Sequence, residues 1–434
     1  MPGVLQRSEV EGFARRQRGQ MVTRTGSDHA ILDALMQDAL DAARPMGQFA
    51  GRLPNRPRGR TIVVGAGKAA ASMAQAFESA WPHPIEGLVI TRYGHSARTR
   101  SIEVVEASHP VPDTAGLQAA QRIFDLVKTA GRDDLVVALI SGGASSLLSL
   151  PAPGLSLDEK RAITSALLRS GAPISAMNEV RKALSAIKGG RLAAVSRAPV
   201  VTYVISDVPG DDPATVGSGP TIPASSRSTG PRAILDRYGI EVPPHVMKIV
   251  ETNRAPEIAP GAVHVITTAK SALDAAASTA RRLGIEPLVL GDAIEGEARE
   301  AGIVMAGIAR AVLRHGMPVS RPCVILSGGE TTVTVRQAGR GGRNTEFLLS
   351  LALALDGAGV SAIAVDTDGI DGSEDNAGAW FDATLVPTAR DLGIDLQAHL
   401  DGNDAYGAFA RMNRLVVTGP TLTNVNDFRA ILIR

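Results

Sequence analysis

The sequence predicts an α/β protein of two domains, and three observations support this prediction. The chain has 434 residues, a length typical of two or three domains. Apolar residues make up 44% of the chain and charged residues 21%, which is enough to fill large buried cores. Short runs of apolar, often β-branched residues alternate with segments of helical periodicity, a pattern typical of parallel sheets that helices cover on both faces.

The first half of the chain is expected to form one domain, over residues 28–250. Helical periodicity begins near Asp28, with Ser27 or Asp28 as the N-cap. We expect strands at 60–64, 87–91, 102–105, 134–140 and 200–206, and helices between them at 69–81, 113–130 and 157–170. Residues 1–27 show no periodicity, and we expect a flexible tail there. The alternation of strands and helices predicts a Rossmann-like three-layer domain.

The second half continues the pattern after a Pro- and Ser-rich stretch and is expected to form a second domain, over residues 251–434. Its expected strands lie at 264–267, 287–290, 323–326, 332–336 and 361–365, and its helices at 271–283, 294–315 and 345–355. The predicted fold is therefore two Rossmann-like α/β domains. Because α/β sheets bind ligands at the carboxyl ends of their strands, we expect an active-site cleft between the domains.

The composition disfavours several classes of protein. A net charge of +1 and an aromatic share of 3% give neither the basic surface nor the stacking platforms of a nucleic-acid binder. The one cysteine, Cys323, excludes an intramolecular disulfide and lies in an apolar run typical of a buried strand. No apolar stretch reaches the ~20 residues of a membrane span, and the start of the chain lacks a secretory signal. We therefore expect a cytoplasmic protein with no membrane or nucleic-acid partner.

A glycine-rich turn follows the first expected strand. Gly65 and Gly67 fit the dinucleotide-binding pattern G-x-G-x-x-A. The next strand ends at Arg92, without the carboxylate that would bind a cofactor ribose. Lys68 lies within the turn, at the start of a helix, where backbone N–H groups favour anions. We therefore expect Lys68 to bind a phosphoryl or carboxylate group.

A second glycine loop ends the fourth strand, and a similar loop recurs in the second half. Paired glycines let several backbone N–H groups point at one anion, and the hydroxyl groups add donors. Neither loop is a Walker A motif, which requires a lysine at its end. The expected ligand-binding residues are Ser141, Gly142, Gly143, Ser145 and Ser146 in the first loop, and Ser327, Gly328, Gly329 and Glu330 in the second.

Two groups of polar residues flank the fifth strand. One face of an expected helix, which continues to Lys188, carries Asn178, Arg181 and Lys182. Their spacing fits a solvated face as well as a binding face. They are included among the expected ligand-binding residues. Asp207 directly follows the buried strand, a position suited to catalysis as a general base or to a metal ligand.

The second half carries an arginine loop and an acidic loop. Arg343 ends a glycine-rich segment, and its guanidinium can bind phosphate or carboxylate with two hydrogen bonds. Asn344 and Glu346, in the first turn of the following helix, are expected to bind the ligand as well. Acidic residues gather after the strand at 361–365. Asp368 among them is, with Asp207, a candidate ligand for Mg²⁺, which one or two carboxylates hold together with phosphate oxygens.

Together these motifs resemble a known family. The segments 64–70, 108–113, 141–146, 178–182 and 206–211 resemble the N-terminal domain of the glycerate 2-kinases. The segments 327–332, 341–346, 367–372 and 418–427 resemble their C-terminal MOFRL domain. The resemblance covers residues 28–434 and implies an enzyme that uses ATP and Mg²⁺ to convert D-glycerate to 2-phosphoglycerate. It also implies that Lys68 and Arg343 are catalytic. We add Asp207 to the expected catalytic residues because of its position at the end of a strand.

Two other functions remain open at this point. Members of the family are often labelled hydroxypyruvate reductases, and the turn at 65–70 would suit an NAD(P)-dependent enzyme. Lys68 and the missing ribose carboxylate disfavour that interpretation. A non-catalytic module that binds carboxylates or sugar phosphates would explain the anion-binding loops but not the acidic clusters. A homodimer is also compatible with the sequence.

Overall fold

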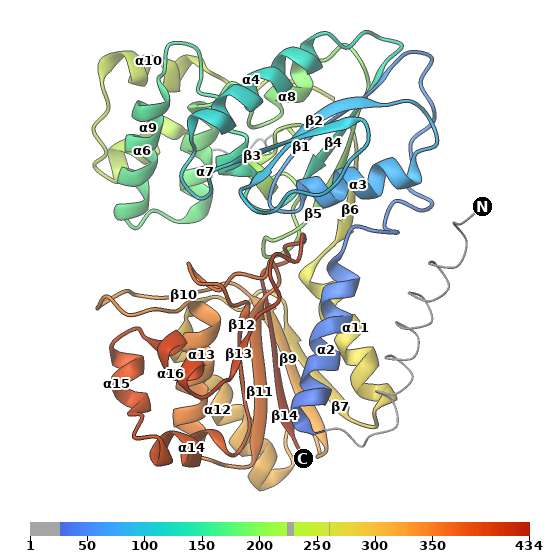
Figure 1. Cartoon of the computed structure of the whole chain (residues 1–434). Coiled ribbons are helices and arrows are strands. Elements are labelled where there is room, and N and C mark those ends of the chain that lie inside the picture. The colour runs from blue at the N-terminus through green and yellow to red at the C-terminus, as the bar shows by residue number, and fades with distance from the viewer. Residues whose placement is uncertain (1–26, 224–229, 260) are drawn as a thin grey trace, which may run out of the picture.

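The computed structural model describes residues 27–223, 230–259 and 261–434 (Figure 1). It contains two α/β units, each with a six-stranded sheet, so the predicted α/β class is confirmed. The residues expected to form a flexible tail lie outside the described ranges except for Ser27. That residue caps helix α2 (Asp28–Ala43), as predicted.

The first sheet is parallel throughout, in the order β3-β2-β1-β4-β5-β6. This order is that of doubly wound dinucleotide-binding folds. Its strands are β1 (Thr61–Ala66), β2 (Glu86–Arg92), β3 (Ile102–Ala107), β4 (Leu135–Ile140), β5 (Val200–Ile205) and β6 (Ala262–Thr267). The central strands β1 and β4 are buried along their whole length, because helices cover both faces.

The helices of the first unit form two layers and a separate lobe. α3 (Ala70–Ala80) covers one face of the sheet. The other face is covered by α4 (Thr114–Lys128), α5 (Ala144–Leu147), α8 (Arg191–Ala194) and the 3-10 turn η1 (Val216–Ser218). Four further helices share an apolar cluster of their own, and we call them the helical lobe (Figure 1). They are α6 (Leu157–Arg169), α7 (Ile174–Ala183), α9 (Pro231–Arg237) and α10 (Pro244–Thr252).

The second sheet is mixed, in the order β13-β12-β11-β14-β9-β7, and among its pairs only β7–β9 is parallel. Its strands are β7 (Glu286–Gly291), β9 (Cys323–Gly329), β11 (Val360–Asp366), β12 (Gly378–Phe381), β13 (Leu415–Val416) and β14 (Asp427–Ile433). This unit is α/β but differs from a parallel Rossmann-like sheet, because β14 enters antiparallel between β9 and β11. The strand expected at 332–336 is reduced to β10 (Thr331–Thr332), which pairs with β8 (Gly296–Glu297).

Two elements cross the domain boundary that the sequence places at residue 250. Helix α2 packs with α11 (Ala269–Arg282) on one face of the second sheet (Figure 1). Strand β6 belongs to the first sheet, where it pairs with β5. The described part of the chain therefore starts with a helix on the second sheet, passes through the first unit and returns to the second unit after β6. The other face of the second sheet carries α12 (Ala298–His315), α13 (Arg343–Leu355), α14 (Leu385–Asp391), α15 (Leu396–Asp401) and α16 (Ala405–Arg411).

One apolar core joins the two units. It includes Val63 and Tyr203 of the first sheet as well as Leu326 and Ile363 of the second. This shared core holds the facing loops of the two units close together. Cys323 is buried in β9, as predicted. None of the helices in the described ranges has both the length and the apolar character needed to cross a membrane.

Candidate active site

The turn after β1 and the loop after β4 pack against each other. Gly67 has a φ of +135°, and a Cβ on it would lie 2.1 Å from Ser141 Oγ, so the turn requires glycine. The amide of Lys68 donates a hydrogen bond to the carbonyl oxygen of Gly142 (2.8 Å). The amide of Ala69 donates to Ser141 Oγ (3.1 Å). Two of the predicted anion-binding loops are therefore neighbours.

Lys68 reaches across to the second unit. Its Nζ lies 2.6 Å from Asp368 Oδ2, and the Asp368 side chain is only 1% exposed. Burial alone lowers the pKa of Lys68, but Asp368 and Asp366 outweigh it and raise that pKa above its ordinary value. Burial raises the pKa of Asp368, but Lys68 outweighs it and lowers the pKa below its ordinary value. Both groups are thus charged at neutral pH and form an ion pair between the units.

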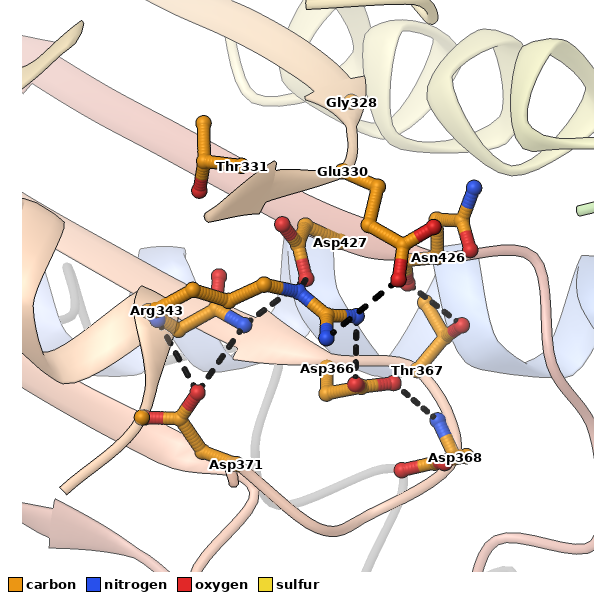
Figure 2. Close-up of polar contacts among 12 residues, drawn as sticks. Gly328, Glu330, Thr331, Arg343, Asp366, Thr367, Asp368, Asp371, Asn426 and Asp427 are labelled. Atoms are coloured by element: carbon orange, nitrogen blue, oxygen red, sulfur yellow. Dashed lines mark hydrogen bonds and ion pairs between the residues drawn. The ribbon is translucent and has the colours of Figure 1, made fainter. Parts of the chain in front are cut away.

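Arg343, the first residue of α13, contacts three carboxylates (Figure 2). Its Nε donates to Asp427 Oδ1 (2.8 Å), and its Nη2 donates to Asp366 Oδ2 (2.7 Å). Its Nη1 lies 3.6 Å from Glu330 Oε1. Asp366 and Asp427 are direct partners on the adjacent strands β11 and β14, so their side chains can share one guanidinium. Burial lowers the pKa of Arg343, but these carboxylates raise it well above its ordinary value.

The first turn of α13 is held by buried polar contacts. The amide of Asn344 donates to Asp371 Oδ1 (2.9 Å), which satisfies a donor that the start of a helix leaves free. Glu346 accepts hydrogen bonds from Arg299 Nε (2.9 Å) and Asn403 Nδ2 (3.0 Å). Asn344 and Glu346 are both nearly inaccessible to solvent. Their contacts orient the helix that presents Arg343.

The loop before β14 supplies two residues that the sequence-based set of site residues omits. Asn424 Nδ2 donates to Asp207 Oδ2 (3.2 Å), and Asn426 Nδ2 donates to the backbone oxygen of Asp207 (2.5 Å). The loop thus reaches from the second unit to the strand end of β5. The asparagine-rich segment just before the last strand is the sequence signal that could have identified them.

Asp207 lies close to the loop after β4 and to both candidate cations. A Cβ on Gly142 would lie 1.9 Å from Asp207 Oδ2, so glycine is what allows this approach. Burial and the nearby Glu330 raise the pKa of Asp207 to about 6, although Lys68 and Arg343 act in the opposite direction. The structure therefore brings the three predicted catalytic residues to one place between the units.

The loop after β9 differs from the loop after β4, which it resembles in sequence. Ser327, Gly328 and Gly329 are still part of β9, and their backbone groups pair with β14. The chain then continues into β10, whereas the loop after β4 enters a short helix. Within this loop the structure brings Glu330 to the site, where its half-exposed side chain faces Arg343.

The third predicted group of binding residues lies in the helical lobe. Its members are Asn178, Arg181 and Lys182, all on α7. The helix expected to continue to Lys188 ends at Ala183, and the chain then turns back toward the loop after β4. As a result, Lys188 Nζ donates to the backbone oxygen of Ser145 (2.7 Å). Next to it, Ser146 Oγ donates to the backbone oxygen of Gly143 (3.1 Å).

A histidine that the sequence-based set omits lies beside Lys68. A Cβ on Gly143 would meet the ring of His109 at 3.1 Å and Lys68 Cγ at 3.3 Å. Burial, followed by the charge of Lys68, lowers the pKa of His109 to about 4, so the ring is neutral at pH 7. His109 falls within the segment 108–113, which is part of the family resemblance without an assigned role.

The chain is similar to proteins that carry two different names. Residues 29–251 match a domain of unknown function, DUF4147, and residues 323–427 match the MOFRL family. A D-glycerate 2-kinase from Thermotoga maritima is 39% identical over 397 residues, which cover 91% of this chain and 95% of the relative. The chain belongs to the glycerate 2-kinase family. A relative from Agrobacterium vitis, 52% identical over 438 residues (99% of this chain, 100% of the relative), is provisionally named a hydroxypyruvate reductase. The crystal structure of a glycerate kinase from T. maritima has a TM-score of 0.85 at 39% identity, covering 93% of this chain and 99% of that chain.

The candidate site of this family member lies where the two matched regions meet. Lys68 and Asp207 belong to the first region, and Arg343 and Asp368 to the second. Within the described ranges, no three acidic, histidine or cysteine side chains gather as a ready-made metal site. Mg²⁺ in phosphoryl-transfer sites needs only one or two carboxylates, because phosphate oxygens and water complete its shell. The separate carboxylates of Asp207 and Asp368 are compatible with such a site.

Proposed function

We propose that the protein is a glycerate 2-kinase, which transfers the terminal phosphoryl group of ATP to the 2-hydroxyl group of D-glycerate and forms 2-phosphoglycerate. One observation carries the proposal: Lys68 and Arg343, from opposite units, bind carboxylates two residues apart, at the end of β11 and in the loop that follows it. Lys68 pairs with Asp368 and Arg343 with Asp366, and the amide of Asp368 donates to Asp366 Oδ1 (3.0 Å). The relative named D-glycerate 2-kinase supports the choice of substrate.

The two cations are suited to stabilise a phosphoryl group in transfer. In such reactions the negative charge spreads over the oxygens of the transferring group, and enzymes act mainly by positioning and by charge stabilisation. Lys68 can exchange its contact with Asp368 for a phosphoryl oxygen, because its side chain is flexible and partly exposed (14%). Arg343 is held by three carboxylates and provides a fixed positive charge beside it.

Asp207 is the proposed general base. Its pKa of about 6 is close to neutral pH, which favours efficient proton transfer. The 2-hydroxyl oxygen of glycerate attacks the terminal phosphorus, the hydroxyl proton passes to Asp207, and ADP leaves with the electrons of the broken P–O bond. Asn424 holds the carboxylate in place through its hydrogen bond to Oδ2.

Asp368 is the proposed Mg²⁺ ligand. Lys68 keeps the pKa of this carboxyl low, so it is ionised and can bind the metal when Lys68 moves to the phosphoryl group. Asp207 is not assigned to the metal, because as the general base its carboxylate must be free to accept the hydroxyl proton. Bound together with phosphate oxygens, Mg²⁺ would neutralise part of the charge on the nucleotide.

The reductase name of one relative predicts a different site, and the geometry disfavours it. A dinucleotide places its pyrophosphate at the start of the helix after β1. In this chain the Lys68–Asp368 ion pair lies at that point, and the Asp368 carboxylate would repel the pyrophosphate. Strand β2 ends at Arg92 instead of a carboxylate that could bind the ribose.

The test is a pair of assays on the same purified protein. D-glycerate with MgATP should give ADP and 2-phosphoglycerate, which ³¹P NMR separates from 3-phosphoglycerate. Hydroxypyruvate with NADH or NADPH should give no oxidation of the cofactor. The variant Lys68→Met, purified in parallel, controls for contaminating kinases. Reduction of hydroxypyruvate without formation of ADP from glycerate would refute the proposal.

A further inference from the structure

A second group of positive charges lies in and beside the helical lobe, apart from Lys68 and Arg343. It consists of Lys160 on α6, Arg181 on α7 and Lys188 after α7, and we call it the cationic group. Lys160 is 5% exposed and Lys188 only 1%. The Nζ of Lys160 has no hydrogen-bond partner among the described residues. In the part of the chain that the structure describes, no carboxylate forms an ion pair with any of the three.

Such a group is costly for the folded chain. A buried charge normally has an opposite charge beside it, whereas the charges that act on Lys160 and Lys188 are those of other cations. Burial, followed by the charge of Arg181, lowers the pKa of Lys160 to about 7. Burial, followed by Lys160 and Arg181, lowers the pKa of Lys188 well below its ordinary value. A bound anion would supply the negative charge that the protein itself leaves out.

The cationic group is connected to the candidate active site through one loop. Lys188 Nζ donates to the backbone oxygen (2.7 Å) and to Oγ (3.0 Å) of Ser145. Two residues earlier in this loop, Gly143 approaches the Lys68 side chain so closely that a Cβ would lie 3.3 Å from Lys68 Cγ. Lys188 and Lys68 therefore both contact one short segment, which consists of the loop after β4 and the helix α5 that follows it.

We propose that the cationic group binds the phosphate chain of the nucleotide, so that ATP extends along the loop after β4 with its terminal phosphate toward Lys68. This inference rests on the proposed kinase function and adds Lys160 and Lys188 to the binding residues. A polyphosphate matches several unpaired cations, whereas glycerate offers one carboxylate.

The decisive variant is Lys160→Met. Because Lys160 Nζ has no hydrogen-bond partner to lose, the variant should fold, and methionine retains most of the side-chain volume. Calorimetric titration with ATP, and separately with inorganic tripolyphosphate, should show affinities lower by about 10- to 100-fold, as expected for the loss of a charged hydrogen bond. The KM for D-glycerate should stay unchanged. Lys248→Met, at an exposed position of α10 in the same lobe, is the matched control and should bind both probes like the wild type.

Two results would overturn the subsite. One is wild-type affinity of Lys160→Met for both ATP and tripolyphosphate; the other is a rise in the KM for D-glycerate alone, which would assign the group to the carboxylate. Arg181→Gln provides a second variant with the same expectation, should Lys160→Met fail to fold. If the wild type binds ATP and tripolyphosphate through Lys160 but does not phosphorylate glycerate, the proposed function fails and the phosphate subsite stands.

Discussion

Lys160→Met should stabilise the protein at neutral pH, by an amount that decreases as the pH rises. Burial and Arg181 lower the pKa of Lys160 to about 7 in the folded chain, whereas a lysine of the unfolded chain has a pKa of about 10.4. Between these values the unfolded chain binds more protons, so the stability of the wild type rises with pH. Below this window the buried charge imposes its full cost, and above it both states are neutral.

The two pKa values give the size of the effect. With about 7 for the folded chain and about 10.4 for the unfolded chain, Lys160 costs about 4 kcal/mol at pH 7 and about 2 kcal/mol at pH 9. Methionine carries no charge and loses no hydrogen bond at this position. The advantage of Lys160→Met in free energy of unfolding should therefore shrink by about 2 kcal/mol between pH 7 and pH 9.

Urea unfolding followed by circular dichroism at pH 7, 8 and 9 measures this difference. Lys248→Met, with an exposed side chain on α10, should match the wild type at each pH. Saturating ATP should reduce the advantage of Lys160→Met at pH 7, because a ligand stabilises the chain that binds it more tightly. A variant less stable than the wild type at pH 7, or a difference that does not change with pH, would refute the reasoning that Lys160 is an uncompensated buried cation.

Four further variants test the site between the units. Lys68→Met should lower kcat by about 10²–10³ and, by leaving Asp368 buried without its cation, destabilise the fold by about 3–5 kcal/mol. The double variant Lys68→Met/Asp368→Asn should recover thermal stability but not kcat, and full recovery of both would remove Lys68 from the mechanism. Asp207→Asn should lower kcat by about 10²–10⁴ with little change in the KM for ATP; an unchanged kcat in steady-state assays would exclude it as the base. Arg343→Lys keeps the charge, but a lysine cannot contact two carboxylates with one planar group, so both the melting temperature and kcat should fall. Wild-type values for both would contradict the contacts assigned to Arg343.

The parts of the site that the sequence predicted well depend on local structure. Strands β1, β4 and β5 are largely apolar runs, and Lys68, Ser141 and Asp207 follow them within two residues. Since the carboxyl ends of parallel strands lie at one edge of a sheet, the order of residues alone places these three side chains near one another. The family resemblance was needed to connect them to Arg343, because nothing local relates the two units.

The arrangement of the second sheet could not be predicted in the same way. Strand β14 contains Arg429, a buried charge that interrupts the apolar pattern of a central strand. Arg429 is tolerated there because, besides its ion pair with Asp427 on the same strand, its Nη1 donates to the backbone oxygen of Gly328 (3.2 Å) and its Nη2 to Thr331 Oγ1 (3.0 Å). Only the folded sheet creates these last two contacts. The position of β14 between β9 and β11 in turn sets Asp427 opposite Asp366. The contacts of Arg343 thus depend on a pairing between segments about sixty residues apart, about which the local sequence pattern says nothing.

The cationic group shows why spacing on a helix misled the assignment of Lys188. The interval from Arg181 to Lys188 fits two helical turns, which predicts a shared face on one helix. The helix instead ends at Ala183, and Lys188 reaches Ser145 by the return of the chain. The sequence does not predict the burial of Lys160 either, because charged residues on an amphipathic helix usually face solvent. Natural sequences depart from such rules mainly where function requires it. Lys188 contacts the segment after β4 that also approaches Lys68. Lys160, whose charge acts on Lys188, has no hydrogen-bond partner among the described residues. A ligand therefore explains this group of cations better than the fold does.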